Sequence, residues 1–242
     1  MLFTQLPLNK GLKVLDIGTF DDNGVTPSSI VKYNKKIYLY YIGLKPRCTT
    51  RYSLVAGLAV SKNLGNIFNR ISRSPILFNN DKEPYSILTA PYVLKINKKW
   101  HMWHVSCEKW INPDFPIYNI KYAHSYDGKK WFQTGKVSIK LKKNERAVAR
   151  PCVINIGKKY YMFYAYEKFN SKYKIGIALS DDLINWRRKD NLSDFISAKN
   201  SKINFDNEMQ TYPSVFKYKK KIYMLYNGNN YGKNGIGMAV LT

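Results

Sequence analysis

The sequence predicts an all-β protein of the β-propeller class, and an internal repeat carries that prediction. One pattern occurs four times along the 242 residues, at intervals of roughly 60 residues, a period typical of repeat architectures such as propellers. Each copy contains a proline, a short β-branched stretch, a lysine-rich turn and an aromatic-rich strand; the copies span 27–41, 91–104, 151–164 and 213–226. The 20 tyrosines of the chain also favour strands over helices.

Each repeat is predicted to form a four-stranded sheet, beginning with an inner strand directly after the proline. The second strands, IYLYY, WHMWH, YYMFY and IYMLY, are almost continuously apolar, as expected for strands buried on both faces. The third strands share one alanine, whose small side chain allows neighbouring sheets to approach closely; these residues are Ala59, Ala123, Ala178 and Ala239. An aromatic residue then begins the outer strand, as at Phe68, Trp131 and Trp186.

The last repeat contains three predicted strands, and the N-terminal residues Leu2–Ile17 are predicted to supply its outer strand. Pairing of the two ends closes the ring and removes exposed sheet edges. Four repeats favour four blades, and a five-bladed ring is the alternative. We find no linker and no helical period, so residues 1–242 are predicted to form a single propeller domain.

Charge and cysteine content restrict the class of protein. The 40 Lys and Arg against 16 acids give a net charge of +24, which suits a polyanionic partner. Basic runs are short, however, so a nucleic-acid partner is not expected, and the lysine pairs in the turns after the inner strands are predicted to serve solubility. The three cysteines lie far apart, and neither a signal peptide nor an apolar membrane span is recognisable, so we expect a cytoplasmic protein.

Acidic residues precede the inner strands, in loops that share one face of a propeller with the loops leaving the second strands. Asp21 and Asp22 precede Pro27, Glu145 precedes Pro151, and Glu208 precedes Pro213. We therefore expect these carboxyl groups to converge on the mouth of the central channel. Paired carboxyl groups suit cleavage or transfer of a glycosyl unit, because one protonates the leaving oxygen while the other activates water or attacks. The alternative is that these acids cap turns.

Other polar and aromatic residues on this face are candidate substrate-binding groups. Arg150 is placed to hold a carboxylate or an anionic substrate. Sugar-binding candidates from the surrounding loops are Tyr85, Trp110, Tyr212, Tyr231, Asn227 and Asn229. His104 ends the second strand of its repeat, where it either reaches the channel mouth or packs in the core. Neither a metal site nor a cofactor-binding motif is recognised, so none is predicted.

Six segments resemble a group of bacterial β-propeller proteins similar to glycoside hydrolase families 32, 43, 68 and 130. They are GTFDDNGVTPSS, YYIG, SYDGKKW, ERAVARP, FDNEMQTYPSV and YNGNNYGKNGIGMA, and the resemblance covers about residues 18–242. It implies that Asp21 or Asp22 is the base or nucleophile and that Glu145 is the acid. It also implies that Glu208 or Asp206 is a further acid of the site.

The sequence thus predicts a carbohydrate-active protein that cleaves or transfers a glycosyl unit at an acidic central pocket. The partner is a saccharide or a glycoconjugate, in carbohydrate metabolism or polysaccharide biosynthesis. Two alternatives remain open at this point: a propeller that binds carbohydrate without catalysis, and a basic scaffold for a polyanionic partner.

Overall fold

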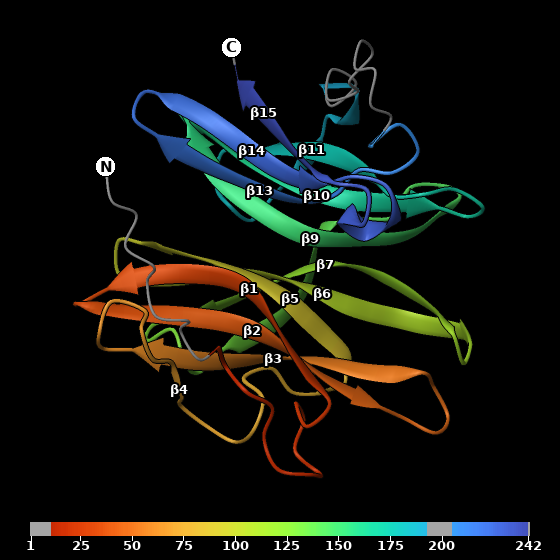
Figure 1. Cartoon of the computed structure of the whole chain (residues 1–242). Coiled ribbons are helices and arrows are strands. Elements are labelled where there is room, and N and C mark those ends of the chain that lie inside the picture. The colour runs from red at the N-terminus through yellow and green to blue at the C-terminus, as the bar shows by residue number, and fades with distance from the viewer. Residues whose placement is uncertain (1–10, 193–204, 242) are drawn as a thin grey trace.

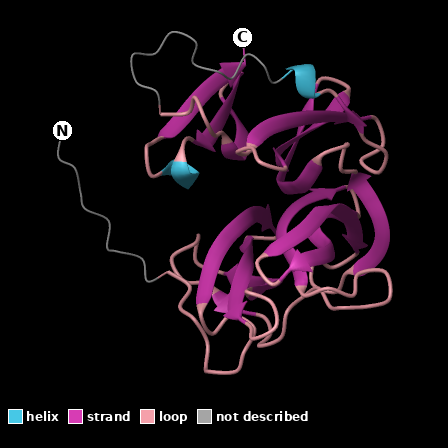
Figure 2. Ribbon diagram, turned by 90° about the vertical axis from the view of Figure 1, so that its right-hand side faces the viewer, coloured by secondary structure: helices cyan, strands magenta, loops and turns pink. Residues whose placement is uncertain are grey.

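The computed structural model describes residues 11–192 and 205–241, and strands account for most of this part of the chain (Figures 1 and 2). The strands form four successive antiparallel units, which we call units 1 to 4. Unit 1 contains β1 (Gly24–Tyr33), β2 (Lys36–Pro46), β3 (Tyr52–Ser61) and β4 (Asn69–Arg70). Unit 2 contains β5 (Ile87–Ile96), β6 (Lys99–Asn112), β7 (Phe115–Ser125) and β8 (Phe132–Ile139).

Unit 3 contains β9 (Glu145–Ile156), β10 (Lys159–Lys168), β11 (Lys174–Ser180) and β12 (Arg187–Arg188). Unit 4 contains β13 (Thr211–Tyr218), β14 (Lys221–Asn227) and β15 (Ile236–Leu241). The predicted all-β fold and the order of inner, second and third strands in each repeat are confirmed. Among the described residues, no helix has the length and apolar character needed to cross a membrane.

The inner and second strands of each unit are joined by tight turns at one end of the sheet. In unit 1, Asn34 and Lys35 both have positive φ, 48° and 59°, which is the geometry of a two-residue hairpin turn. Asn97, Gly157 and Lys219 have positive φ in the corresponding turns. The lysine pairs therefore lie at the hairpin end of the units, while the loops that follow the second strands lie at the opposite end.

The core is a series of interfaces between successive units. Trp100 and Met102 of unit 2 pack with Tyr40 and Leu58 of unit 1, and Trp103 packs with the side chains of unit 3. Between units 3 and 4 the corresponding cluster contains Cys152, Ile175, Val215, Met224 and Tyr226. Burial on both faces explains why the second strands are apolar throughout. The predicted small residues Ala59, Ala123 and Ala178 are fully buried, whereas Ala239 is half-buried.

A glycine on the third strand faces an aromatic ring on the second strand in three of the units. The pairs are Tyr41 with Gly57, Tyr164 with Gly176 and Tyr226 with Gly237. A Cβ atom at Gly57 would lie 2.3 Å from the ring of Tyr41, so these glycines are required by close packing. In unit 2 the smaller His104 stands where the tyrosines stand, and Lys121 occupies the glycine position.

Short parallel contacts connect the ends of neighbouring units. Leu54 and Val55 of β3 pair with the start of β5, and Tyr118 of β7 pairs with Ala147 of β9. These contacts fix the starts of the inner strands relative to the preceding unit. They therefore determine which side chains meet at the end of the molecule opposite the lysine turns.

The predicted closure by the N-terminal segment falls partly on described residues. Residues 11–17 form no strand; the Lys13 carbonyl accepts a hydrogen bond from Arg70, and Asp16 pairs with Arg73. These residues therefore lie along unit 1. Residues Leu2–Lys10 lie outside the described part of the chain, so closure of the ring and the number of blades stay predictions.

Candidate functional site

Three residues directly before the repeat prolines have the left-handed backbone conformation. Ala90, Arg150 and Tyr212 have φ values of 47°, 52° and 55°. Each lies at a β-bulge, where the pairing of the inner strand with the second strand shifts register. Positive φ is uncommon for residues other than glycine and costs on the order of 1–3 kcal/mol. Such bulges redirect side chains, and all three of these residues line the same cavity.

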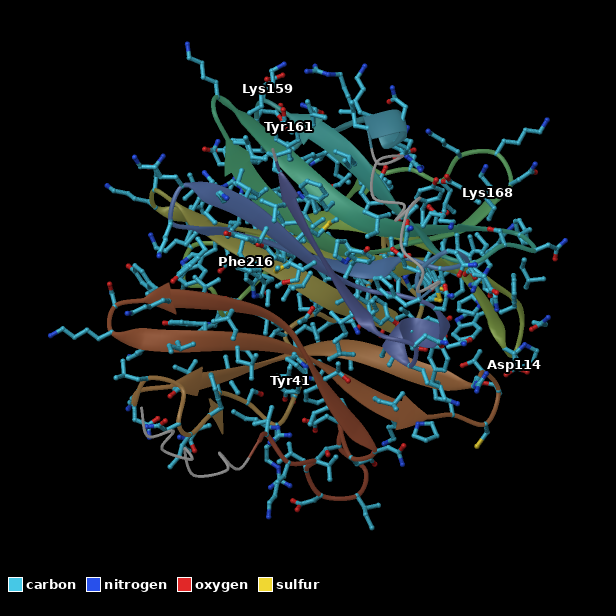
Figure 3. The ribbon with its side chains drawn as sticks, turned by 45° about the horizontal axis from the view of Figure 1, so that its top comes forward. Tyr41, Asp114, Lys159, Tyr161, Lys168 and Phe216 are labelled. Atoms are coloured by element: carbon cyan, nitrogen blue, oxygen red, sulfur yellow. The ribbon has the colours of Figure 1, made fainter. Side chains whose placement is uncertain are left out.

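This cavity lies at the end of the units opposite the lysine turns and has a volume of about 350 Å³, within the range of small-ligand sites. Its floor is formed by the bulges, and its walls by the loops after β2, β6, β10 and β14. The polar and aromatic lining residues are Arg51, Tyr52, Thr89, Asp114, Phe115, Tyr118, Arg146, Arg150, Tyr173, Tyr212 and Tyr231. Asp114 marks this end of the molecule in Figure 3, with Lys168 at the same end.

The charge of the lining is opposite to the prediction. Three guanidinium groups and five tyrosines line the cavity, and in the described part of the chain Asp114 is the one carboxylate among the lining residues. This cavity therefore lacks the acidic lining that the sequence predicted. A second cavity of about 240 Å³, between β10 and β14, is lined by apolar and tyrosine side chains and offers no charged group.

Arg150 is the most informative residue of the cavity. Its guanidinium carbon lies 4.6 Å from the centre of the Tyr212 ring, a cation–π contact. Within residues 11–192 and 205–241, no carboxylate forms an ion pair with Arg150. Burial lowers the pKa of this guanidinium from its ordinary value. A partly buried positive charge without a negative partner is a favourable site for an anion.

Arg146 connects the cavity with a buried carboxyl group on β10. It forms an ion pair with Glu167, and its guanidinium also lies against the rings of Phe115 and Tyr173. The hydroxyl groups of Tyr118 and Tyr173 are hydrogen-bonded to each other at the cavity wall. Burial raises the pKa of Glu167, although Arg146 and a hydrogen bond from Tyr173 oppose this shift.

The predicted acids do not meet at the cavity. Asp21 is fully buried and accepts hydrogen bonds from Tyr41 Oη at 3.0 Å and Arg70 Nε at 2.9 Å. Asp22 accepts a hydrogen bond from the Gly18 amide and lies 3.8 Å from Lys45 Nζ. Both contacts belong to unit 1, so these two acids join strands and loops within the unit.

Glu145 also forms its side-chain contacts within its own unit. Its two carboxylate oxygens accept hydrogen bonds from Arg188 at 2.8 and 2.7 Å, and Arg188 in turn contacts Asp190. Successive side chains of a strand point to opposite faces, so Arg146, the next residue, lines the cavity while Glu145 points away from it. The sequence indicated the correct segment but not the phase of the strand.

The acids before unit 4 follow the same pattern. Asp206 is buried and accepts a hydrogen bond from Tyr226 Oη at 2.7 Å. Glu208 is exposed, and its backbone amide donates to Asn229 Oδ1 at 3.1 Å. Asn229 is buried beneath this loop, and Asn227 donates to the Tyr231 carbonyl. Both asparagines therefore shape the loop that carries Tyr231 into the cavity.

The remaining aromatic candidates, Trp110 and Tyr85, are not among the residues that line the cavity. Trp110 packs edge-on against Tyr52, with ring centres 5.7 Å apart, and thereby supports a lining residue. Tyr85 is exposed and does not line the cavity. Arg150, Tyr212 and Tyr231 are thus the predicted site residues that the structure brings together, and their role in binding stays a prediction.

His104 is buried against Glu83, with 2.8 Å between Nε2 and Oε2. Burial alone would raise the pKa of Glu83, but the contact with His104 outweighs it and lowers this pKa to about 2. A carboxyl group with a lowered pKa stabilises the fold above its unfolded pKa, about 4.5, and this contribution is lost as the pH falls towards 2.

Glu83→Gln is therefore expected to weaken the acid dependence of stability, because the variant has no carboxylate at this position to protonate. Urea unfolding at neutral pH and near pH 3 is the measurement. The wild-type protein is expected to lose on the order of 2–3 kcal/mol more than the variant between these conditions. An equal loss in both proteins would contradict the assignment.

Sequence reasoning missed Arg51, Tyr52, Asp114, Tyr118, Arg146 and Tyr173. Arg51, Asp114 and Tyr173 lie in or beside the loops that leave the second strands, which the sequence had placed on the correct face. The signal that was available is the residue before each proline, since Ala90, Arg150 and Tyr212 all occupy that position.

Comparisons with known proteins identify a family model and a relative whose sequences match this chain. The model of glycoside hydrolase family 130, described as beta-1,4-mannooligosaccharide phosphorylase, matches residues 114–240. An uncharacterised protein of Mycobacterium tuberculosis strain CDC 1551 is 33% identical over 246 residues, covering 96% of this chain and 79% of the relative.

Solved structures share the fold at low sequence identity. A thermostable family-43 glycoside hydrolase has a TM-score of 0.65 and 19% identity, over 90% of this chain and 71% of that chain. A family-32 β-fructofuranosidase of Bombyx mori has a TM-score of 0.63 and 13% identity, over 88% of this chain and 46% of that chain. The fold is thus that of the β-propeller glycoside hydrolases.

Proposed function

Because this chain belongs to glycoside hydrolase family 130, we propose that it processes a glycosidic bond in the arginine- and tyrosine-lined cavity, with an oxyanion as the second substrate. The observation that carries the proposal is Arg150, a partly buried guanidinium that has an aromatic neighbour and no carboxylate partner in the described residues. Inorganic phosphate suits such a group, because guanidinium forms paired hydrogen bonds with phosphate oxygens.

The proposed reaction is phosphorolysis or its reverse, transfer from a glycosyl phosphate. A phosphate oxygen forms a bond to the anomeric carbon while the bond from that carbon to the glycosidic oxygen breaks. The electron pair of the broken bond goes to the glycosidic oxygen, which takes up a proton from an acid. Phosphate itself is the nucleophile, so this chemistry needs one carboxyl group where hydrolysis uses two, separated by about 5–9.5 Å.

Glu167 is our candidate for the acid. Burial raises the pKa of its carboxyl group, which favours the protonated form that a proton donor requires. Glu167 does not line the cavity itself but contacts two residues that do, Arg146 and Tyr173. The carboxylate left after proton transfer would be stabilised by Arg146. Asp21, Asp22, Glu145 and Asp206 are, in this proposal, structural groups of their own units.

The tyrosines supply the saccharide-binding surface. Tyr212 and Tyr231 lie 6.1 Å apart between ring centres, and Tyr173 contacts Tyr231 edge-on. Aromatic faces pack against the apolar faces of sugar rings, while their hydroxyl groups are available to hydrogen-bond sugar hydroxyls. This wall faces Arg150, so a sugar and an oxyanion can lie side by side.

The test is turnover of β-1,4-linked manno-oligosaccharides with and without inorganic phosphate, followed by phosphorus NMR of the glycosyl phosphate. Arg150→Gln is expected to lower kcat/KM about 100-fold or more, because the variant loses a buried charge contact with phosphate. Arg187→Gln, at an exposed arginine outside the cavity lining, is the matched control and is expected to change it by less than about threefold. Hydrolysis independent of phosphate would overturn the proposal.

A second candidate function is saccharide binding without catalysis. It is favoured by one observation: the residues presented to the cavity by the three bulges, Ala90, Arg150 and Tyr212, include no carboxylic acid. Calorimetric binding of the same saccharides without turnover, in either the presence or the absence of phosphate, would support this candidate over phosphorolysis.

A further inference from the structure

The hairpin end of the molecule, remote from the cavity, carries a concentrated positive charge. We define the lysine face by the four turns at 34–36, 97–99, 157–159 and 219–221 and by the loops that follow the third strands of units 1 to 3. Ser61, Ser125 and Ser180, which end these third strands, pair with the second residues of β2, β6 and β10, so the loops lie beside the turns. Figure 3 shows Lys159 at this end of β10, with Lys168 at the other end.

The acids on the lysine face already have partners. Asp127 and Asp182 accept hydrogen bonds from backbone amides and a serine hydroxyl in their own loops. Asp181 pairs with Arg187 and, at 4.0 Å, with Lys159. Lys36, Lys98, Lys158 and Lys220, one in each turn, are all exposed. The net charge of this face is therefore strongly positive.

Apolar side chains protrude from the same loops. The loops after β3, β7 and β11 have a similar conformation. Each contains a serine whose hydroxyl accepts a backbone hydrogen bond, then Asn or Asp, and then a residue with positive φ, which is Leu64, Gly128 or Leu183. Leu183 is 5% exposed and packs in the core, whereas Leu64 is 80% exposed. Tyr126, in the loop after β7, is 69% exposed. The positive φ of Leu64 belongs to this shared loop geometry, but its side chain, unlike that of Leu183, is left in solvent.

We propose that the lysine face docks on a bilayer surface rich in anionic lipid. Clustered lysines are attracted to anionic headgroups, and isolated apolar side chains at loop tips insert among them. The phosphates of a nucleic acid would pair with the lysines, but a nucleic acid has no apolar interior into which the Leu64 side chain could insert. Docking in this orientation directs the cavity away from the bilayer, towards a saccharide carried in solution or held above the membrane.

Flotation of the full chain with vesicles tests this proposal and is independent of any catalytic activity. Phosphatidylcholine vesicles are compared with vesicles that contain about 30 mol% phosphatidylglycerol. The binding variant replaces one lysine in each turn by glutamine: Lys36, Lys98, Lys158 and Lys220. The matched control removes the same charge from exposed lysines outside the lysine face: Lys109, Lys143, Lys168 and Lys233.

The binding variant is expected to lose about 600-fold in partition onto anionic vesicles, since each of the four lysines contributes about fivefold. The control is expected to bind like the wild-type protein. Leu64→Ser is expected to weaken the binding that remains at high salt, where charge is screened, while Ile111→Ser, an exposed apolar residue at the cavity end, should leave it unchanged.

Three results would overturn the proposal. One is equal loss in the binding variant and the control, which would mean that total charge and not this face is responsible. Another is equal binding to neutral and anionic vesicles. The third is tight binding to heparin or a DNA duplex with no binding to anionic vesicles, which would identify a soluble polyanion as the partner.

Discussion

Replacing Gly176 by alanine is expected to destabilise the protein by about 3 kcal/mol. The new Cβ atom would lie 2.5 Å from Cε2 of Tyr164 and 2.8 Å from Oδ1 of Asp190. The tyrosine ring cannot move aside, because it is fully buried, its hydroxyl donates to Asp190, and Arg188 lies against its face. Urea unfolding measures the loss of free energy.

Gly24→Ala is the control for this prediction, since its Cβ would meet Leu44 at an ordinary 3.4 Å. Unit 2 suggests a rescue: His104 faces Lys121 there, so a histidine leaves room for a side chain on the third strand. Tyr164→His combined with Gly176→Ala is therefore expected to recover part of the lost stability. If Gly176→Ala unfolds like the wild-type protein, the close packing described here is incorrect.

Glu145→Gln is expected to lower stability by about 2 kcal/mol and to leave the turnover of the folded protein unchanged. The substitution disrupts the buried bidentate ion pair between Glu145 and Arg188. Breaking a buried pair commonly costs about 3–5 kcal/mol, but Arg188 keeps its contact with Asp190, which reduces the loss. The acid role implied by the sequence resemblance predicts the opposite, a stable protein without turnover.

Two measurements on the same preparation distinguish these outcomes. Urea unfolding gives the stability of Glu145→Gln, and initial rates at a temperature where the variant is folded give its turnover. Asp81→Asn, at an exposed acid away from the cavity, is the control and should change neither quantity. Complete loss of turnover in well-folded Glu145→Gln would restore Glu145 as the catalytic acid.

The repeat pattern predicted the strand order well, because hydrophobic runs and lysine turns depend on local sequence. It failed for the acids because their direction depends on the phase of the strand and on distant partners. Glu145 and Arg146 are adjacent, and nothing in the sequence says which of them meets Arg188, 43 positions later. Arg150 and Tyr212 were identified because the proline beside each of them marks where the chain enters the inner strand.

The bulges before the prolines allow residues that line the cavity to differ without a change in how the sheets pack. Ala90, Arg150 and Tyr212 lie at β-bulges with positive φ, and each of them lines the cavity. One position in each of units 2, 3 and 4 is thus free to change identity while the sheets keep their packing. Divergence within such a family needs few substitutions to exchange an acid for a base or an aromatic ring, and with it one class of substrate for another.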